Sequence, residues 1–312
     1  MKTIKIRLGG SCNQNCSFCH SNKNDQYKFN HKLIPFIKYN HYNKINYGGG
    51  EPLLYWSCIK FFIDTFPNLK HHIVTNGSLF NKEMLEYTTK YDLRIGVSIN
   101  DFTSISDETA LLLSQVQQLG YAVIYSGDKT LDQLDALIDK MNDRLNKKVY
   151  PLYNLMHTTC NNSEAYTKEQ ITNYIDGIDS RVRDCVNSLF KFRTNSRYNM
   201  MTYLLIRELS NRVPGCSNYN FTTVSLDGRY MECSYDGSYT HTIEQELSYP
   251  RYNSKECYNC NLKGRCTSCV KSINKDECYI YNKIDQNLDL VLKEYNLDRE
   301  TLYNTLSRKE FK

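Results

Sequence analysis

Residues 3–19 read TIKIRLGGSCNQNCSFC, a strand-like segment that runs directly into three closely spaced cysteines. Its first part, residues 3–8, is predicted to form a short buried strand. Cys12, Cys16 and Cys19 follow on one loop, in the spacing C-x3-C-x2-C. A [4Fe–4S] cluster normally binds four cysteines, so three thiolates on one loop would leave one iron open to a substrate or cofactor.

The alternative for this loop is a zinc site with a histidine as the fourth ligand. His20 and His31 are close enough in the sequence to complete it. Zinc knuckles, however, usually pair two C-x2-C units, and this loop has one. The spacing therefore favours a cluster.

Strand-like and helical segments alternate over the first 153 residues. Strands are expected at residues 3–8, 44–47, 71–75, 93–99, 121–125 and 148–153. Helices are expected at residues 53–66, 81–91, 106–120 and 131–145. Such alternation predicts a parallel sheet. Because a complete eight-stranded barrel usually takes about 250 residues, we expect an α/β fold with a partial (β/α)6 TIM-type barrel.

Reactive groups in such sheets lie at the carboxyl ends of the strands. The cysteine loop follows the first predicted strand, and Gly49, Gly50, Glu51 and Pro52 follow the second. We therefore expect both loops at the same rim. Glycines there would let the backbone approach a ligand closely, and Glu51 could interact with an ammonium group.

The composition is ordinary for a globular protein, with 312 residues of which 40% are hydrophobic and 23% charged. The chain has no apolar run of about 18 residues and no signal peptide, so we expect a cytoplasmic protein without a membrane partner. The net charge of +5 is spread along the chain and gives no indication of a nucleic-acid partner. The 13 cysteines are then expected to serve metal ligation or catalysis rather than disulfides.

The cysteines gather at the two ends of the chain, with three near the start and seven in the last hundred residues. This distribution predicts two modules. The expected divisions are a barrel core at residues 1–153, a helical bridging segment at 154–215, a small cysteine-rich C-terminal domain at 216–280 and a closing helix at 281–312. Further helices are expected at 167–190, at 200–209, and at 285–306 with a break near Asn296.

The segment CNQNCSFC at 12–19, coupled to GGEP at 49–52, resembles the signature of the radical SAM superfamily. The resemblance implies that Cys12, Cys16 and Cys19 hold a [4Fe–4S] cluster whose open iron chelates the amino and carboxylate groups of S-adenosylmethionine. It also implies that an electron from the cluster cleaves the sulfonium and yields a 5′-deoxyadenosyl radical. A flavodoxin- or ferredoxin-type protein would supply that electron.

The resemblance extends to residues that would bind S-adenosylmethionine. Phe18 stands where relatives usually have an aromatic residue near the adenine, and residues 49–52 would contact the amino group. Ser98 and Asn100 would lie near the ribose and the methionyl part, or would only cap the end of the fourth strand. The partner of the carboxylate stays unassigned, because residues 98–113 lack the arginine that many relatives carry.

The second group of cysteines resembles the SPASM extension of radical SAM enzymes, which holds two auxiliary [4Fe–4S] clusters. The last close pair is separated by two residues here and by three in the usual pattern. By resemblance, one cluster would be held by Cys257, Cys260, Cys266 and Cys278, and the other by Cys216, Cys233 and Cys269. The fourth ligand of the second cluster would be missing or supplied by Cys185. The alternative is a zinc ribbon built from the two C-x2-C pairs.

Three cysteines remain outside these clusters. Cys58 lies in an apolar helical segment and is expected in the core. Cys160 and Cys185 lie in the bridging segment. Either could donate a hydrogen atom to a substrate radical, as in peptide epimerases of this family, or be an inert buried thiol.

SPASM relatives mostly act on peptides or proteins, so the resemblance implies an oxidoreductase that modifies a peptide or protein by crosslinking, epimerisation or oxidation. Because the sequence begins at the first strand, leader-peptide binding is expected to need a separate protein or the bridging segment. One alternative is a small-molecule radical SAM dehydrogenase of the aminocyclitol type. An alternative from another class is a non-catalytic zinc or iron–sulfur binding protein.

Overall fold

The computed structural model describes residues 2–19, 21–100, 105–149, 151–155, 166–187, 221–231, 239–245 and 276–302. Within these ranges, nine strands form one sheet in the order β6-β5-β4-β3-β2-β1-β7-β8-β9. The strands are β1 (Thr3–Arg7), β2 (Lys44–Gly48), β3 (Lys70–Thr75), β4 (Arg94–Ile99), β5 (Leu119–Tyr125), β6 (Pro151–Leu155), β7 (Phe221–Ser225), β8 (Arg229–Met231) and β9 (Tyr239–Thr242). The helices are α1 (Leu33–Tyr39), the 3-10 helix η1 (Pro52–Tyr55), α2 (Trp56–Thr65), α3 (Lys82–Tyr91), α4 (Asp107–Ser114), α5 (Leu131–Leu145), α6 (Lys168–Val186) and α8 (Asp276–Glu294).

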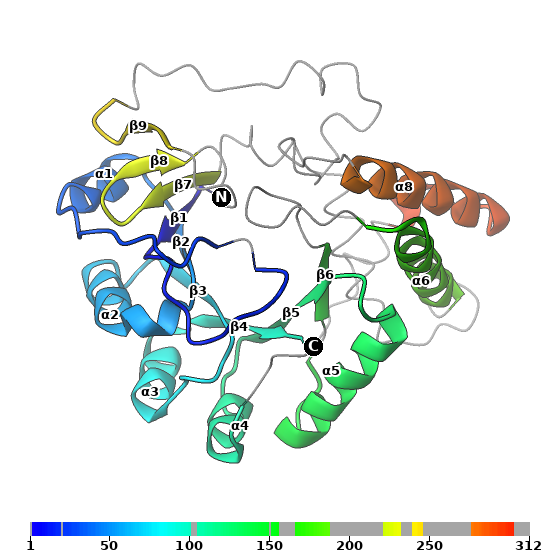
Figure 1. The fold of residues 1–312 in the computed structure, drawn as a ribbon, viewed down its shortest axis with the longest axis horizontal. Coiled ribbons are helices and arrows are strands. Elements are labelled where there is room, and N and C mark those ends of the chain that lie inside the picture. The colour runs from blue at the N-terminus through cyan, green and yellow to red at the C-terminus, as the bar shows by residue number, and fades with distance from the viewer. Residues whose placement is uncertain are drawn as a thin grey trace.

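Strands β1 to β6 are parallel and alternate with helices along the chain, as the sequence predicts. The sheet curves, and helices α1 to α5 lie outside the curve (Figure 1). The strand order is linear, with β6 and β9 at the edges, so the barrel does not close within the described residues. The α/β fold with a partial (β/α)6 TIM-type barrel is therefore confirmed.

The sheet presents an apolar face to the helices, because side chains alternate between the two faces of each strand. Ile45 and Tyr47 of β2 are almost completely buried. The ring of Tyr47 packs against Phe62 of α2, with the ring centroids 6.3 Å apart. Residues of the opposite parity, such as Asn46 and His72, consequently lie on the concave inner face, where the strands carry polar side chains.

Strands β7 to β9 extend the sheet beyond β1 and are absent from the sequence prediction. β7 pairs with β1 in parallel, with Val224 opposite Ile6, and β8 returns antiparallel to β7. The turn between β7 and β8 contains Asp227 and Gly228, and Gly228 has a φ of 85°. An Asp-Gly pair between two short β-rich segments is a strong hairpin signal. The sequence prediction missed this hairpin because it assigned residues 216–280 to a separate cysteine-rich domain.

The helix predicted at 106–120 is wrong in its second half. α4 ends at Ser114, and β5 begins at Leu119. The glutamines between them favour helix locally. Pairing with β4 outweighs this preference, since the N–H of Ile95 donates to the carbonyl oxygen of Gln118 over 3.0 Å. The prediction also lacks α1, a short helix that buries two apolar side chains.

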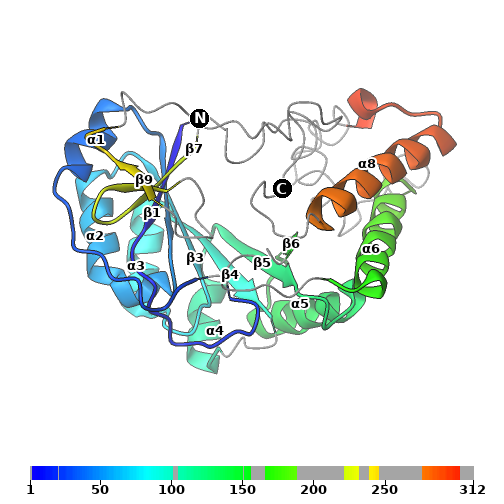
Figure 2. The same cartoon turned by 45° about the horizontal axis from the view of Figure 1, so that its top comes forward.

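Helices α6 and α8 lie side by side beyond β6 (Figures 1 and 2). α6 confirms the helix predicted at 167–190. α8 begins at Asp276, before the expected closing helix, so Cys278 lies in its first turn. The predicted break is confirmed, because Asn296, just after α8, has a left-handed φ of 52°. The helix predicted at 200–209 lies outside the described residues.

The predicted division of the chain into four parts stays a prediction, because most of residues 154–280 lie outside the described ranges. β7 and β8 come from the predicted C-terminal domain but share the sheet of the barrel. In the described part of the chain, no helix combines the length and the apolar character needed to cross a bilayer.

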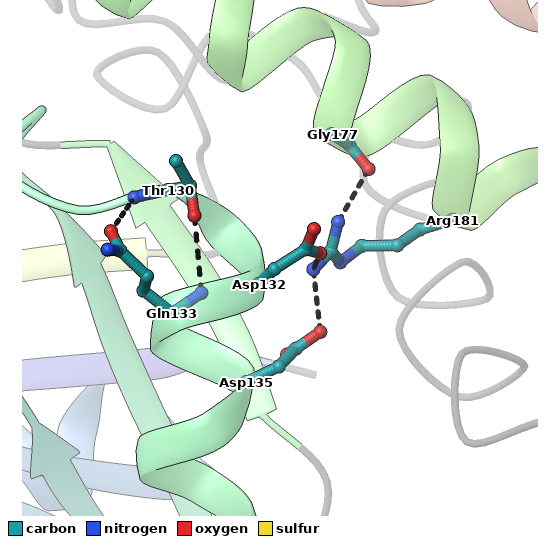
Figure 3. A network of polar contacts seen from close by, with 6 residues as sticks. All are labelled: Thr130, Asp132, Gln133, Asp135, Gly177 and Arg181. Carbon is teal, nitrogen blue, oxygen red and sulfur yellow. Dashed lines mark hydrogen bonds and ion pairs between the residues drawn. The ribbon is translucent and has the colours of Figure 1, made fainter.

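Helix α5 begins at a capping box, which Figure 3 shows. The Oγ1 atom of Thr130 accepts from the N–H of Gln133 over 3.3 Å, and the Gln133 Oε1 atom accepts from the N–H of Thr130 over 2.8 Å. Both N–H groups would otherwise lack a partner at the start of a helix. The sequence at 130–133 thereby sets where α5 starts.

An ion pair ties α6 to α5 (Figure 3). Arg181 of α6 is 4% exposed, and its guanidinium contacts Asp135 at 2.6 Å and Asp132 at 2.9 Å. It also donates to the carbonyl oxygen of Gly177 over 2.8 Å. The side chain of Asp135 is 8% exposed, whereas that of Asp132 is 90% exposed. Asp135 is therefore the partner that compensates the buried charge.

Replacing Asp135 by alanine is expected to destabilise the fold far more than replacing Asp132 by alanine. The first change leaves the charge of Arg181 without its buried partner, which costs about 3 kcal/mol. The second removes a contact that solvent already screens. Urea unfolding of both variants and the wild type measures the difference. Equal losses in the two variants would contradict the role given to Asp135.

His71 of β3 is a buried neutral imidazole, with 2% of the residue exposed. Its Nε2 atom lies 3.0 Å from the carbonyl oxygen of Phe66, and its Nδ1 atom lies 2.8 Å from the hydroxyl of Tyr47. Because a carbonyl oxygen only accepts, Nε2 carries the proton and Nδ1 accepts from Tyr47. Burial lowers the pKa of His71 below its ordinary value of 6.5. The pKa of the neighbouring His72 is lowered to about 3, mainly by burial.

The protein is therefore expected to lose stability as the pH falls below 6.5, because the unfolded chain then binds protons that the folded histidines do not. The variant His71→Phe should show a shallower dependence on pH. His41→Asn, at an exposed position with a φ of 51°, should leave the dependence unchanged. Unfolding free energies at about pH 7.5 and about pH 5.5 test this. A wild-type slope in His71→Phe would refute it.

Candidate functional site

The loops after β1 and β2 lie against each other at the carboxyl edge of the sheet, which confirms their predicted common rim. The N–H of Gly50 donates to the carbonyl oxygen of Gly9 over 2.9 Å, and that of Glu51 donates to the carbonyl oxygen of Ser11 over 2.8 Å. Gly49 has a φ of 133°, and a Cβ atom there would lie 2.2 Å from the Gly9 oxygen. Glycine is therefore required for the two backbones to come this close.

A third loop, after β3, is joined to the cysteine loop by side-chain hydrogen bonds. The Nδ2 atom of Asn76 donates to Oδ1 of Asn13 over 2.8 Å, and Nδ2 of Asn13 donates to the hydroxyl of Ser78 over 2.8 Å. Asn13 directly follows Cys12 in the chain. The cysteine loop is thus held between the loops of two other strands.

The carboxylate of Glu51 lies buried within this network, with 2% of the residue exposed. Its Oε1 atom accepts from the hydroxyl of Thr75 over 2.5 Å and from the N–H of Leu53 over 3.0 Å. Its Oε2 atom accepts from the N–H of Asn76 over 2.8 Å. Burial raises the pKa of Glu51, and these three hydrogen bonds oppose the rise.

The three hydrogen bonds occupy most of the roughly four acceptor positions of the Glu51 carboxylate. The side chain thereby joins the loops that follow β2 and β3. The contact expected between Glu51 and an ammonium group stays a prediction. Pro52 is buried directly after it, at the start of η1.

The three cysteines of the loop after β1 are free thiols and partly exposed. The pKa of Cys16 is raised first by burial, then by the charges of Cys19 and Cys12. The three sulfur atoms are therefore close enough for thiolate charges to repel one another. A positively charged metal group would relieve that repulsion.

Lys23 closes the loop that carries the cysteines. Its ammonium donates to the carbonyl oxygen of Gln14 over 2.7 Å and to Oδ1 of Asn15 over 2.8 Å. Its charge also opposes the rise in the pKa of Cys16. The hydroxyl of Ser21 donates to the carbonyl oxygen of Gly49 over 3.0 Å, which links the far side of the loop to β2.

The donor set fits a [4Fe–4S] cluster. Soft thiolates are the ligands that such clusters take, and a cubane meets each thiolate at a different iron. Across the described ranges, no three Cys, His, Asp or Glu side chains are arranged around one metal ion. Of the two histidines considered for zinc, His31 packs its ring against Phe29, with centroids 4.8 Å apart. His20 lies outside the described residues.

Two predicted cofactor-binding residues, Phe18 and Asn100, line the same small pocket. Phe18 comes from the cysteine loop, and Asn100 follows β4. The sequence prediction missed the other side of this pocket, which the chain builds with Ile124, Ser126, Asp128, Lys129 and Leu134. The segment SGDK directly after β5 was the available signal, because polar residues at a strand end face the same rim. Ser98 is half-buried on β4 and stays a predicted contact.

The remaining cysteines are placed as follows. Cys185 is completely buried in α6, which agrees with an inert core thiol. Cys58 packs against the core as predicted, and burial raises its pKa to about 11. Cys278 lies in the first turn of α8. The other predicted cysteines lie outside the described residues, and their roles stay predictions: Cys160, Cys216, Cys233, Cys257, Cys260, Cys266 and Cys269.

A buried ion pair, absent from the sequence prediction, anchors the cysteine loop to the end of β1. Arg7 is 2% exposed, and its guanidinium lies 2.8 Å from Oδ2 of Asp25. The hydroxyl of Tyr27 donates to the same oxygen over 3.0 Å, and the N–H of Gly10 donates to the carbonyl oxygen of Asp25 over 2.7 Å. An arginine within an apolar strand indicates a buried partner, but the sequence does not identify which acid it is.

Residues 6–158 match the family model described as Radical SAM superfamily. An uncharacterised protein of Methanocaldococcus jannaschii is 29% identical over 111 residues, which span 32% of this chain and 39% of that protein. The radical SAM cyclopropyl synthase TigE of Paramaledivibacter caminithermalis is 27% identical over 131 residues, which span 32% of this chain and 27% of TigE. The chain thus matches well under half of the length of these two relatives.

Two solved structures share the fold over most of the chain. The structure of anSMEcpe with bound AdoMet and the Cp18Cys peptide has a TM-score of 0.64 at 13% identity, covering 94% of this chain and 98% of that chain. The structure of Streptococcus suis SuiB bound to the precursor peptide SuiA has a TM-score of 0.56 at 16% identity, covering 86% of this chain and 72% of that chain. At these identities the likeness concerns the fold alone.

The variant Glu51→Gln is expected to lose about 1–3 kcal/mol of stability, because its amide presents a donor to one of the buried donors around it. It should also bind less iron on anaerobic reconstitution, because the cysteine loop rests on these loops. Urea unfolding and iron per chain measure the two effects. The control Glu83→Gln, which changes an exposed carboxylate paired with Lys60 at 2.6 Å, should alter neither. Wild-type stability and iron content in Glu51→Gln would contradict the role of this carboxylate.

Proposed function

We propose that the chain, whose residues 6–158 match the Radical SAM superfamily model, is an enzyme of this superfamily that modifies a peptide or protein. The observation that carries the enzyme assignment is the joining of three loops at one rim. There the loop with Cys12, Cys16 and Cys19 lies against the glycine segment after β2. A non-catalytic zinc or iron–sulfur protein would require the cysteines but not the glycine segment packed against them.

The chain's own residues supply the ligands and the pocket. Cys12, Cys16 and Cys19 would hold a [4Fe–4S] cluster, and Phe18 and Asn100 would border the bound S-adenosylmethionine. When bound, these cofactors supply a 5′-deoxyadenosyl radical that takes a hydrogen atom from an unactivated C–H bond. The barrel wall would orient the substrate below the rim.

Two solved structures with the same fold contain bound peptides, which supports a peptide substrate. The anSMEcpe structure contains a peptide together with AdoMet, and the SuiB structure contains its precursor peptide. Both likenesses extend well beyond residues 6–158, since they cover 94% and 86% of this chain. We therefore extend the proposal to peptide modification, with crosslinking, epimerisation and oxidation as the candidate reactions.

The finer assignments follow the sequence. The segment at 216–280 would be a SPASM-like domain with two auxiliary [4Fe–4S] clusters, held by its cysteines and by Cys278 in α8. A flavodoxin- or ferredoxin-type protein would supply electrons in the cytoplasm. Cys160 and Cys185 remain the candidate hydrogen-atom donors. The complete burial of Cys185 makes Cys160 the better candidate of the two.

The variant Cys16→Ala is expected to abolish the formation of 5′-deoxyadenosine from S-adenosylmethionine after anaerobic reconstitution and addition of dithionite. The loss of one of three thiolates leaves the cluster too few ligands. Chromatography of the nucleoside product measures it. The matched control Cys58→Ala removes a thiol from α2, away from the loop, and should retain the activity. Continued cleavage by Cys16→Ala would refute the site.

A further inference from the structure

The inner face of the barrel carries positive charge at the start of its strands, away from the cysteine loop. Asn46 of β2 is paired with His72 of β3, and His72 is paired with Arg94 of β4. In the neighbouring row on the same face, Lys44 is paired with Lys70. These residues therefore form a continuous patch across three strands, which we call the inner-face patch.

Glycines give the inner-face patch room. A Cβ atom at Gly96 would lie 3.2 Å from Nε2 of His72, and one at Gly120 would lie 3.9 Å from Nη2 of Arg94. Both side chains thus reach toward a glycine of the neighbouring strand, Gly96 of β4 and Gly120 of β5. Val74, on the same face, is 38% exposed. Lys70 and Arg94 are exposed as well, whereas Lys44, Asn46 and His72 are partly buried, so a ligand would reach the patch from the Lys70 and Arg94 side.

The cations of this patch lack compensating charge. Within the described ranges, Lys44, Lys70 and Arg94 have no ion-pair or hydrogen-bond partner. After burial, the charges of Arg94 and Lys70 lower the pKa of Lys44, so these groups repel one another. Strands β1 to β4 contain no Asp or Glu. The Oδ1 atom of Asn46, on the same face, is buried and has no hydrogen-bond partner in the described part of the chain.

We propose that the inner-face patch, through Lys44, Asn46, Lys70 and Arg94, binds a carboxylate of the peptide substrate. A carboxylate would offset the mutual repulsion of the cations. The inference rests on the proposed peptide substrate and adds an acidic group to its description.

The position of the patch suits an anchor for such a peptide. Asn46 lies roughly 10 Å before Gly49 along β2, at about 3.3 Å per residue. A carboxylate bound there leaves the next residues of an extended peptide near the rim, where Phe18 and Asn100 border their pocket. The anchor is thus separate from the groups that hold the cofactors.

The test uses the full reconstituted chain and a short fluorescently labelled peptide of alternating Gly and Glu, compared with its Gly and Gln counterpart by fluorescence anisotropy. We expect the Glu peptide to bind about tenfold more tightly, with an affinity that falls as salt is added. The double variant Lys70→Glu/Arg94→Glu should lose this preference. Peptides with free and amidated C termini show whether a side-chain or a terminal carboxylate binds, and either result supports the proposal.

The matched control is Lys38→Glu/Lys140→Glu, which changes the net charge equally at exposed positions on α1 and α5 and should keep the preference. Equal affinity for the Glu and Gln peptides in the wild type would overturn the proposal. So would loss of the preference in the control, or tighter binding of a single-stranded oligonucleotide that Lys70→Glu/Arg94→Glu abolishes. Circular dichroism of both double variants keeps a folding defect separate from lost binding.

Cleavage of S-adenosylmethionine without peptide separates this inference from the proposed function. The control variant Lys38→Glu/Lys140→Glu, on α1 and α5, should cleave at the wild-type rate. A wild type that forms no 5′-deoxyadenosine would refute the proposed enzyme, while the anisotropy result still decides whether the patch binds a carboxylate.

Discussion

Glu51 holds three loops in place at once through its buried carboxylate and its backbone N–H. The carboxylate accepts from Leu53 after β2, and from Thr75 at the end of β3 and Asn76 after it, while the backbone N–H donates to Ser11 after β1. Burying a carboxylate is unfavourable, and the raised pKa of Glu51 expresses that penalty. The penalty is tolerable because three donors are aimed at one side chain. The position of the cysteine loop therefore depends on this residue more than on the few apolar contacts that the loop makes itself.

The alternation of side chains gives the barrel two unlike walls. The outer wall is apolar and packs on the helices, as Tyr47 does against Phe62. The inner wall has glycines and cations. Burial and then the charges of Arg94 and Lys70 lower the pKa of Lys44, and this cost opposes folding. Burial on the outer wall offsets this cost. The outer face of these strands thus stabilises the fold, while their inner face is available to a ligand.

Much of the fold follows from local sequence, because alternating apolar residues and caps act over a few positions. The capping box at Thr130 and the parallel strands are of this kind. The errors fall where distant pairing decides, as at Gln118, whose carbonyl oxygen is taken by β4. For the site, the cysteine spacing and the glycine segment after β2 could be recognised in the sequence. The pairing of Arg7 with Asp25 was not, since several acids were equally available in the sequence. Nor was the inner-face patch, whose members come together only through strand register.

The charge of the inner-face patch also imposes a direction on any acidic peptide that enters. The cations lie at the strand starts, roughly 10 Å before the rim. Two unit charges about 10 Å apart interact by roughly 1.7 kcal/mol at an effective dielectric constant of about 20. A carboxylate bound at the inner-face patch is closer to these cations than one at the rim and gains more attraction there. The barrel wall itself can therefore determine which part of a peptide reaches the rim, whatever protein delivers it.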